Sequence, residues 1–323
     1  MPYSESVIRR AMERLRLSAE EKQAEYEAHL AEAYEKYPRL QQIDRRLRES
    51  AAEAVAASFR RGGDPKAAIA ALEEENLALQ DERQWILDAS DYDEDFLDDS
   101  PVCAVCGGRG WVGARMCECL RELCRQEQKK ELAGLLAGNE RFENFQLRFY
   151  PDVYDPALGA SPRHMMQLNF GACRRYANSF RKGSGNLLFS GATGLGKTFL
   201  SACIARQVAD LGYSVTYVSA GKLFSDYERV KFSGADDQEL KKYTDCDLLI
   251  IDDLGTEMRT QFVVSALYAV VNERLQRQQA TIISTNLRPE DLESRYTPQI
   301  ASRLLGCYQL LSFVGTDIRP MLR

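Results

Sequence analysis

Gly191-Ala192-Thr193-Gly194-Leu195-Gly196-Lys197-Thr198 fits the pattern G-x-x-x-x-G-K-[ST]. The apolar run 186–190 before it has the composition of a strand, and residues 199–205 after it read as a helix. In this context glycines let backbone N–H groups close around phosphates, and the helix N-terminus adds a favourable dipole. Lys197 is expected to reach the β- and γ-phosphates, and the Thr198 hydroxyl to bind Mg²⁺. The stretch therefore predicts a nucleoside triphosphate site around which the chain is organised.

Strands and helices alternate on both sides of this loop. Residues 163–182 read as a helix, and residues 213–218 are β-branched and aromatic, as in a strand. A later apolar strand, 281–285, ends at Asn286, whose amide could reach the γ-phosphate or the attacking water. Such alternation predicts an α/β domain with a parallel sheet covered on both faces.

The strand predicted at residues 247–253 ends in two acids, Asp252 and Asp253. Carboxylates at the C-terminal end of a strand lie where ligands bind in open α/β sheets. Asp252 is expected to hold Mg²⁺, as the Walker-B acid does in P-loop NTPases. Asp253 is expected to orient and deprotonate the attacking water. The pair predicts hydrolysis of the bound nucleotide.

Four of the nine cysteines form two closely spaced pairs, Cys103 with Cys106 and Cys117 with Cys119. Each pair can form a turn that presents two sulfurs, and a tetrahedral Zn²⁺ ion takes four. A unit this small needs a cross-link or a bound metal to fold, which favours a metal site over free thiols. A structural zinc is the first interpretation, because a catalytic zinc leaves a coordination position open; an Fe–S cluster is the alternative. Cys124, expected on the helix that follows, is not one of the four expected metal ligands.

The composition is typical of a globular protein of about two domains: 323 residues, 45% hydrophobic and 28% charged, with a net charge of −6. No apolar run approaches the ~20 residues of a membrane span, and no apolar leader segment opens the chain. We therefore expect a cytoplasmic protein without a membrane partner. Residues 1–100 hold 24 acidic and 14 basic residues, whereas 101–323 hold 24 and 28. This small basic excess permits nucleic-acid binding by the C-terminal part.

The first hundred residues carry mainly helical signals. Residues 4–59 have apolar side chains at three- and four-residue steps, with a break or kink expected at Pro38. Asp64 is a good N-cap, and Pro65 fits the first position of a second helix that ends near residue 87. The two stretches predict a hairpin, either a scaffold without a site or a docking module for a partner protein. Seven carboxylates within 88–99 predict a solvated linker or the rim of a contact surface, and the first interpretation is a hinge before the next unit.

The order of the nucleotide motifs resembles that of the AAA+ ATPases. The loop, the acidic pair and the polar strand end follow one another as in that family, where Asn286 matches sensor I. The resemblance implies that Arg303 is an arginine finger acting in trans on a neighbour's nucleotide. It also implies that Arg319 is a sensor-II residue acting in cis. Asp253 stands where many AAA+ members have Glu, so slow hydrolysis is expected.

Three motifs narrow the resemblance to the DnaC/DnaI group of bacterial replicative-helicase loaders, which also includes the IstB-type transposition helpers. They are Ile-Ile-Asp-Asp-Leu-Gly-Thr-Glu at 250–257, Ser-Thr-Asn-Leu at 284–287 and Ser-Arg-Leu at 302–304. The four-cysteine unit, with Gly107 and Trp111, is similar to the zinc-bearing N-terminal region of DnaI-like loaders. The expected domains are a helical hairpin region (1–88), an acidic linker (89–100), a four-cysteine zinc unit (101–125), a connecting helix (126–140) and an AAA+ ATPase domain (141–323).

The resemblance implies ATP, Mg²⁺ and Zn²⁺ as cofactors and a hexameric replicative DNA helicase as partner. The helical and cysteine parts would bind the helicase, the ATPase part would bind single-stranded DNA, and ATP would drive self-association. The segment facing DNA would contain Lys222, Phe224, Tyr227, Arg229, Lys231 and Phe232, a basic and aromatic set suited to base stacking. The same spacing also fits an ordinary amphipathic helix that turns Leu223, Tyr227 and Val230 to the core.

Two other functions fit the motifs. An IstB-like transposition-helper ATPase would regulate a transposase on duplex DNA, although that type does not usually carry a zinc unit. A non-catalytic adaptor would use ATP only as an assembly ligand, with Asp253 idle.

Overall fold

The computed structural model describes residues 3–59, 65–136, 138–233 and 237–322. Contacts divide the chain into two compact units, one of Met1–Glu13 with Glu118–Arg323 and one of Arg14–Cys117. The domain boundaries expected from the sequence at residues 88, 100, 125 and 140 stay a prediction. Within the described ranges, no helix is both long and apolar enough to cross a membrane.

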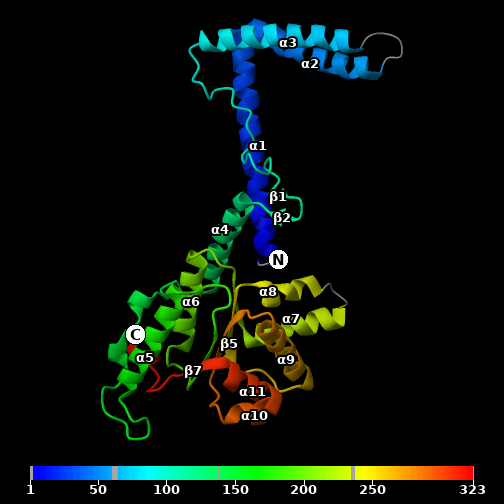
Figure 1. Cartoon of the computed structure of the whole chain (residues 1–323). Helices are drawn as coiled ribbons and strands as arrows, with labels where there is room; N and C mark the ends of the chain where they lie inside the picture. The colour runs from blue at the N-terminus through cyan, green and yellow to red at the C-terminus, as the bar shows by residue number, and fades with distance from the viewer. Residues whose placement is uncertain (1–2, 60–64, 137, 234–236, 323) are drawn as a thin grey trace. The chain divides into compact units, whose positions relative to one another are not determined.

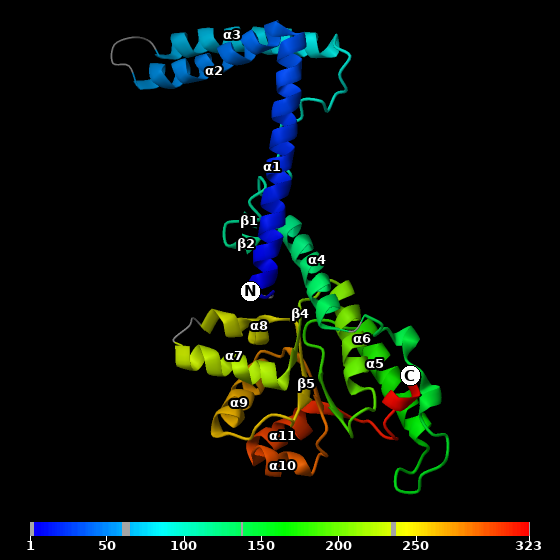
Figure 2. The same cartoon turned by 180° about the vertical axis from the view of Figure 1, so that it is seen from behind.

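The N-terminal helices are α1 (Glu5–Lys36), α2 (Pro38–Phe59) and α3 (Pro65–Asp88). The break expected at Pro38 is confirmed: α1 ends at Lys36, and Pro38 is the first residue of α2. Proline cannot continue a helix but is tolerated in its first turn. The hairpin consists of α2 and α3, which run side by side in both views (Figures 1 and 2), while α1 is a separate long helix. The predicted N-cap Asp64 lies outside the described residues.

Charged side chains join α2 to α3. The ion pairs are Arg39 with Glu82, Arg46 with Glu75, and Asp44 with Arg83. The acidic segment after α3 is not simply a solvated linker, because part of it packs on α1. The ring of Phe96 stacks on His29 with centroids 4.2 Å apart, and Asp98 pairs with Lys22 at 2.8 Å.

A five-stranded sheet forms the centre of the C-terminal part. Its strands are β3 (Asn186–Ser190), β4 (Val215–Ser219), β5 (Leu248–Leu254), β6 (Ala280–Thr285) and β7 (Tyr308–Ser312). They lie in the order β4-β5-β6-β3-β7, and all neighbouring pairs are parallel. The parallel α/β sheet is confirmed. The edge strand β7 was not among the predicted strands.

Helices cover both faces of this sheet, with α5 (Pro162–Asn178) and α6 (Lys197–Asp210) on one face and α7 (Ala220–Ser233) and α9 (Gln261–Gln276) on the other. The other helices of this part are α4 (Glu118–Leu135), α8 (Lys241–Asp245), α10 (Asp291–Arg295) and α11 (Pro298–Cys307). Short elements complete the chain: β1 (Trp111–Val112) pairs with β2 (Arg115–Met116), and η1 (Phe142–Asn144), η2 (Leu147–Phe149), η3 (Asp237–Leu240) and η4 (Arg319–Leu322) are 3₁₀ turns.

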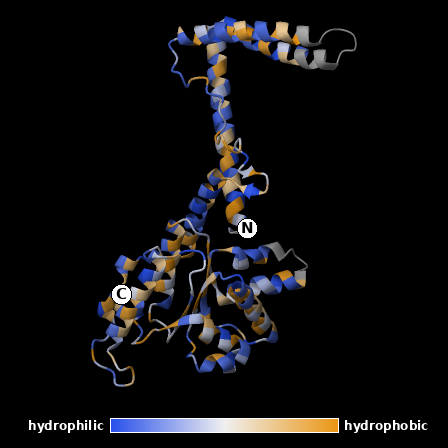
Figure 3. Ribbon diagram, in the orientation of Figure 1, coloured by the Kyte–Doolittle hydropathy of each residue, from blue (hydrophilic) through white to orange (hydrophobic). Residues whose placement is uncertain are grey.

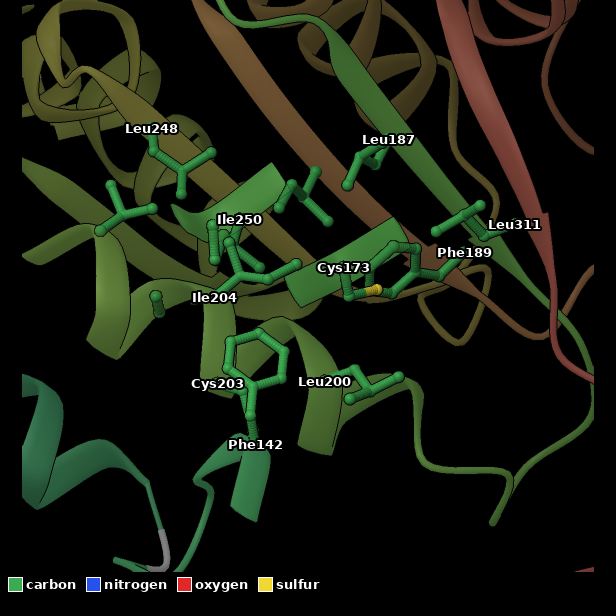
Figure 4. Packing of buried hydrophobic residues seen from close by; sticks show 14 of the residues in the cluster. Phe142, Cys173, Leu187, Phe189, Leu200, Cys203, Ile204, Leu248, Ile250 and Leu311 are labelled. Carbon is green, nitrogen blue, oxygen red and sulfur yellow. The ribbon is translucent and has the colours of Figure 1, made fainter. Parts of the chain in front are cut away.

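Alternate side chains of each strand supply two separate cores, as the two-residue period of a strand requires. Leu187, Phe189 and Ile250 pack with α5 and α6 (Figure 4), while Leu188 and Ile251 pack with α7 and α9 on the other face. Strands β3, β5 and β6 are accordingly rich in buried apolar residues (Figure 3). Burial on both faces places the polar strand ends at the carboxyl edge of the sheet, where open α/β sheets bind ligands.

Helix α4 begins at Glu118, earlier than the connecting helix expected at 126–140. Its Gln128 lies against the edge strand β4, where the side-chain amide donates to the carbonyl of Tyr213 at 2.9 Å. The same amide accepts from the backbone N–H of Val215 at 2.8 Å. One side chain thus makes the two hydrogen bonds that a further strand would make, and it closes this edge of the sheet.

Candidate nucleotide site

The loop 191–198 joins β3 to α6, as expected of a phosphate-binding loop. Gly191, Gly194 and Gly196 have φ values of 151°, 77° and 86°, a region that disfavours residues with a β-carbon. A β-carbon on Gly196 would also lie 2.9 Å from the hydroxyl oxygen of Tyr150. The tight turn therefore needs glycine at these positions. Helix α6 begins directly at Lys197, its N-cap Gly196 has no side chain to cap the first N–H groups, and helix N-termini of this kind bind anions.

Lys197 is buried and folds back over the loop, where its ammonium donates to the carbonyls of Gly191 and Ala192 at 2.7 Å each. Burial lowers the pKa of the amine, and the nearby charges of Asp253 and Asp252 act in the opposite direction. The positive charge of Arg319 adds to the lowering of this pKa. The structure thus brings together four residues that were predicted from distant parts of the sequence.

Asp252, near the end of β5, accepts hydrogen bonds on both of its carboxylate oxygens. The Thr198 hydroxyl lies 3.3 Å from Oδ1, and the Ser284 hydroxyl also donates to Oδ1. The phenol of Tyr217 donates to Oδ2 at 3.0 Å. Burial and the neighbouring carboxylate raise the pKa of Tyr217 well above its usual range. Thr198 and Asp252, the two residues expected to hold Mg²⁺, are therefore in contact. The contacts of Tyr217 and Ser284 with Asp252 were not predicted from the sequence.

Asp253 leaves the regular strand. Its φ is 62°, unusual for a residue with a side chain, and the pairing of β5 with β6 is irregular between Ile251 and Leu254. The backbone N–H of Asp253 donates to the Ser284 hydroxyl at 2.9 Å. Ser284 therefore contacts both acids, and the bulge turns Asp253 outward, where its side chain is exposed. A strained conformation held by neighbouring contacts is typical of functional sites.

Asn286 follows β6 directly. Its Oδ1 is buried and has no hydrogen-bond partner among the residues that the structure describes. A β-carbon on Gly255, just after the Asp252–Asp253 pair, would lie 3.1 Å from this oxygen. The amide therefore lies beside the acidic strand end, with an acceptor available to a ligand.

Arg303 lies on α11 and contacts α9. Its guanidinium donates to Oδ1 of Asn272 and to the Tyr268 hydroxyl, the latter at 2.9 Å, and it stacks over the Tyr268 ring at 4.6 Å. Within its own chain the predicted arginine finger is therefore held against α9 by Asn272 and Tyr268.

The segment after β7 returns to the phosphate-binding loop. The backbone N–H of Ile318 donates to the carbonyl of Gly194 at 3.0 Å, and the N–H of Phe313 donates to that of Ser190 at 2.7 Å. Arg319 follows, with its N–H bonded to the Asp317 carboxylate at 2.9 Å. These contacts place the predicted sensor-II segment beside the loop. No local sequence signal revealed that Asp317 lies against Gly194, because their contact depends on the path of β7.

The loop and Asp252 offer the donors that Mg²⁺ with a nucleotide requires. A hydroxyl and a carboxylate supply hard oxygen ligands, and Mg²⁺ commonly takes one or two carboxylates together with phosphate oxygens. The glycine turns leave the loop backbone open to a close approach. The residues present therefore fit Mg²⁺ and a nucleotide.

The four predicted cysteines also come together. All four Sγ atoms lie within 4.8 Å of one another, with Cys103 and Cys117 3.8 Å apart. A tetrahedral ion with Zn–S bonds of ~2.3 Å requires S–S spacings of about 3.8 Å. An Fe–S cluster spreads its thiolates over several iron atoms, which needs wider spacings. The geometry fits one tetrahedral ion.

Cys124 is fully buried and is not one of the four, and burial raises the pKa of its thiol to about 11.

The segment predicted to face DNA is helix α7, and it is partly an ordinary amphipathic helix. Phe224 is only 4% exposed and belongs to the core with Leu223 and Val230, so its prediction as a base-stacking residue is wrong. Lys222 pairs with the buried Asp226. Phe232 is 73% exposed.

Other members of the predicted set also have partners within the chain. Tyr227 is partly buried, and Arg229 pairs with Glu239. The ammonium of Lys231 lies 5.0 Å from the ring centre of Phe262. The most exposed aromatic side chain of the predicted set is therefore Phe232, whose ring lies beside that of Phe262 with centroids 6.3 Å apart.

Comparison with known proteins supports this arrangement. Residues 120–305 match the family model of IstB-like ATP-binding proteins. The replicative helicase loader DnaI of Bacillus subtilis is 28% identical over 147 residues, which cover 45% of this chain and 45% of DnaI. The loader DnaC of Buchnera aphidicola (subsp. Schizaphis graminum) is 26% identical over 157 residues, 47% of this chain and 63% of DnaC.

The chromosomal replication initiator protein DnaA of Campylobacter jejuni subsp. doylei is 27% identical over 136 residues, 42% of this chain and 31% of DnaA. The chain thus spans less than two thirds of each of these relatives. Among solved structures, a DnaC helicase loader is 22% identical with a TM-score of 0.45, over 54% of this chain and 98% of that one. Since the family model extends from residue 120 to residue 305 of 323, the chain belongs to the family of IstB-like ATP-binding proteins.

Proposed function

We propose that this protein is an ATP-dependent loader of a replicative DNA helicase. The observation that carries the proposal is the contact between Thr198 and Asp252 at 3.3 Å, in a chain whose relatives include proteins named replicative helicase loaders. A phosphate-binding loop joined to an acid at the carboxyl edge of a sheet is suited to Mg²⁺ and ATP. The named relatives support the choice of a helicase as the partner.

The bound Mg²⁺ would neutralise charge on the phosphate oxygens during transfer of the γ-phosphoryl group. Thr198 and Asp252 would hold the ion, and Lys197 would leave its loop carbonyls to bind the β- and γ-phosphates. Asp253 would accept the proton of the attacking water, with Asn286 orienting that water or the γ-phosphate. Because Asp253 is one methylene shorter than Glu, we expect slow hydrolysis.

Two arginines would stabilise the charge that develops on the phosphoryl group. The segment that carries Arg319 packs on the phosphate-binding loop of its own chain through the hydrogen bond between Ile318 and Gly194, which suits a role in cis. Arg303 would complete the site of a neighbouring copy, and its hydrogen bonds to Asn272 and Tyr268 would hold it ready for that contact. Binding of ATP would thus favour side-by-side association of several copies.

The N-terminal part would supply the helicase contact. The four thiolates would hold a structural Zn²⁺, because their spacing matches a closed tetrahedral site. The hairpin of α2 and α3 presents Leu77 and Trp85 on its exposed surface, apolar side chains suited to a protein partner. Single-stranded DNA would contact the ATPase part, with Lys231 and Phe232 as the exposed pair on α7.

A transposition helper is the second candidate, because the matching family model is named for IstB. An assay of helicase delivery separates the two functions. The full-length chain is mixed with the replicative helicase of its host, and helicase bound to single-stranded DNA coated with a binding protein is measured with ATP. We expect delivery by the unaltered chain and none by Lys197→Ala. An unaltered chain that neither binds the helicase nor changes its loading would contradict the loader function, and a transposase would be tested next.

A further inference from the structure

Asp252 is held on both carboxylate oxygens by hydroxyl groups from three different elements. Thr198 on α6 and Ser284 on β6 donate to Oδ1, whereas Tyr217 on β4 donates to Oδ2 at 3.0 Å. A carboxylate turns freely about its last torsion when nothing holds it, since that torsion has broad minima. Here both oxygens are tied, so the orientation of Asp252 is defined before any ligand binds.

The reach of Tyr217 follows from the strand register. Ser219 lies opposite Asp252 in the pairing of β4 with β5, and Tyr217 lies two residues earlier on the same face of the sheet. From there its long side chain extends toward the carboxyl edge, and its ring packs against the core shared with α6. A phenylalanine would fill the same apolar space. The hydroxyl therefore has a role beyond packing.

The phenol also contacts the helix that follows the phosphate-binding loop. Its oxygen lies 3.0 Å from Oγ of Ser201 on α6 and accepts from that hydroxyl, while the phenol's own proton goes to Asp252. Tyr217 thus connects α6 to Asp252. These two elements carry the two side chains that would hold Mg²⁺, so their relative position matters to the site.

We propose that Tyr217 is a positioning residue of the nucleotide site, whose hydroxyl fixes Oδ2 of Asp252 so that Oδ1 faces the hydroxyl of Thr198. The inference rests on the proposed function, because it assigns Asp252 and Thr198 to Mg²⁺. Residues that orient metal ligands commonly change metal affinity by about 10–100-fold when they are removed. A phenol that only satisfied a buried acid would leave that affinity unchanged.

The test measures how the binding of a fluorescent ATP analogue to the full-length chain depends on Mg²⁺. The unaltered chain, Tyr217→Phe and Tyr217→Met are compared, because both variants fill the apolar space without a hydroxyl. Tyr243→Phe is the matched control: its hydroxyl donates to another buried acid, Asp226, at 2.7 Å on the α7 side of the sheet. Circular dichroism confirms the fold of each variant, and each titration is repeated in EDTA.

We expect Tyr217→Phe and Tyr217→Met to bind the analogue normally in EDTA and to need about tenfold more Mg²⁺ for half-saturation. Tyr243→Phe should need the same Mg²⁺ concentration as the unaltered chain. An unchanged Mg²⁺ requirement in both Tyr217 variants would overturn the inference while leaving the proposed function intact. The same conclusion would follow if both variants bound the analogue more weakly by the same factor with and without Mg²⁺. An unaltered chain that binds no nucleotide at all would overturn the proposed function, and the inference with it.

Discussion

The carboxylate of Asp317 occupies the space that a side chain on Gly194 would need. A β-carbon at Gly194 would collide with both carboxylate oxygens, and the backbone there has a φ of 77°. The C-terminal segment therefore packs directly on the phosphate-binding loop, and any residue other than glycine at position 194 would strain the loop and displace this carboxylate.

Gly194→Ala should accordingly lose nucleotide binding and about 1–2 kcal/mol of stability from the left-handed backbone alone. Adding Asp317→Ala removes the collision but leaves the backbone strain, so the double variant should recover only part of the loss. Gly185→Ala is the matched control, because a β-carbon there meets nothing within 4 Å. Urea unfolding and nucleotide titration measure both effects. Equal behaviour of Gly194→Ala and Gly185→Ala would show that this packing is wrong.

A mixing experiment tests whether Arg303 acts in trans. Lys197→Ala keeps the arginine but lacks the phosphate-binding lysine, and Arg303→Ala has the opposite defect. Each variant alone should lose ATP turnover, because an arginine finger is worth about 10³-fold or more in rate. A mixture should regain turnover as protein concentration rises, since Lys197→Ala can complete the site of Arg303→Ala. Arg288→Ala, at an exposed arginine, should keep full activity. A mixture without activity would argue against the trans role.

Asp226 predicts a pH dependence of stability. Burial alone would raise the pKa of this carboxyl, but hydrogen bonds from Lys222, Tyr243 and Lys242 outweigh it and hold the pKa well below its usual range. A lowered pKa in the folded state stabilises the protein above the unfolded value of about 3.9, and this stability is lost as pH falls below it. The unaltered chain should therefore lose its greater stability over Asp226→Asn as the pH is lowered.

At pH 7 we expect Asp226→Asn to be less stable by about 1.5–3 kcal/mol, the range for hydrogen bonds to a charged group. At pH 3 the difference should be clearly smaller. Urea unfolding at both pH values measures it, with Asp152→Asn, at an exposed ion pair, as the control. A difference that is constant between pH 7 and pH 3 would contradict the assignment of Asp226 as a charged, paired group.

The cysteine site predicts one tightly held metal ion per chain. Cys106→Ser should abolish it, because four sulfurs are needed and Cys106 is buried. Elemental analysis should give about one zinc per unaltered chain and none for the variant. Cys307→Ser, at an exposed cysteine outside the cluster, is the control. An unaltered chain without metal, or with iron and inorganic sulfide, would refute the zinc assignment.

Chelation should unfold the cysteine segment while nucleotide binding survives. Trp111 lies between the two cysteine pairs, so its fluorescence reports on this segment when Trp85 is replaced by phenylalanine. A simultaneous loss of nucleotide binding would show that the segment and the nucleotide site do not fold independently.

Local signals were enough to predict the phosphate-binding loop, the acidic strand end and Asn286. In each case a run of apolar residues ends in a polar group, and parallel strands bring such ends to one edge. Tyr217 was missed because its contact depends on the register of β4 against β5. Phe224 was assigned to DNA because a basic and aromatic helix has the same composition whether its rings face water or the core.

Longer-range packing explains other differences. Strand β7 was overlooked because its five residues follow α11 without an intervening loop, so the helical pattern hid the change of structure. Arg274 was not noted either, although it is fully buried and donates to Thr281 and to backbone carbonyls. No local pattern distinguishes an arginine that will be buried among carbonyl groups from one on a surface.

The most direct test of the loader function is the mass of the complex between the full-length chain and the replicative helicase of its host. Light scattering is carried out with ATP and without nucleotide, on the unaltered chain and on Lys197→Ala. We predict a stable complex whose mass depends on ATP for the unaltered chain and not for Lys197→Ala. If the unaltered chain and the helicase elute with their separate masses in both conditions, the central claim is contradicted.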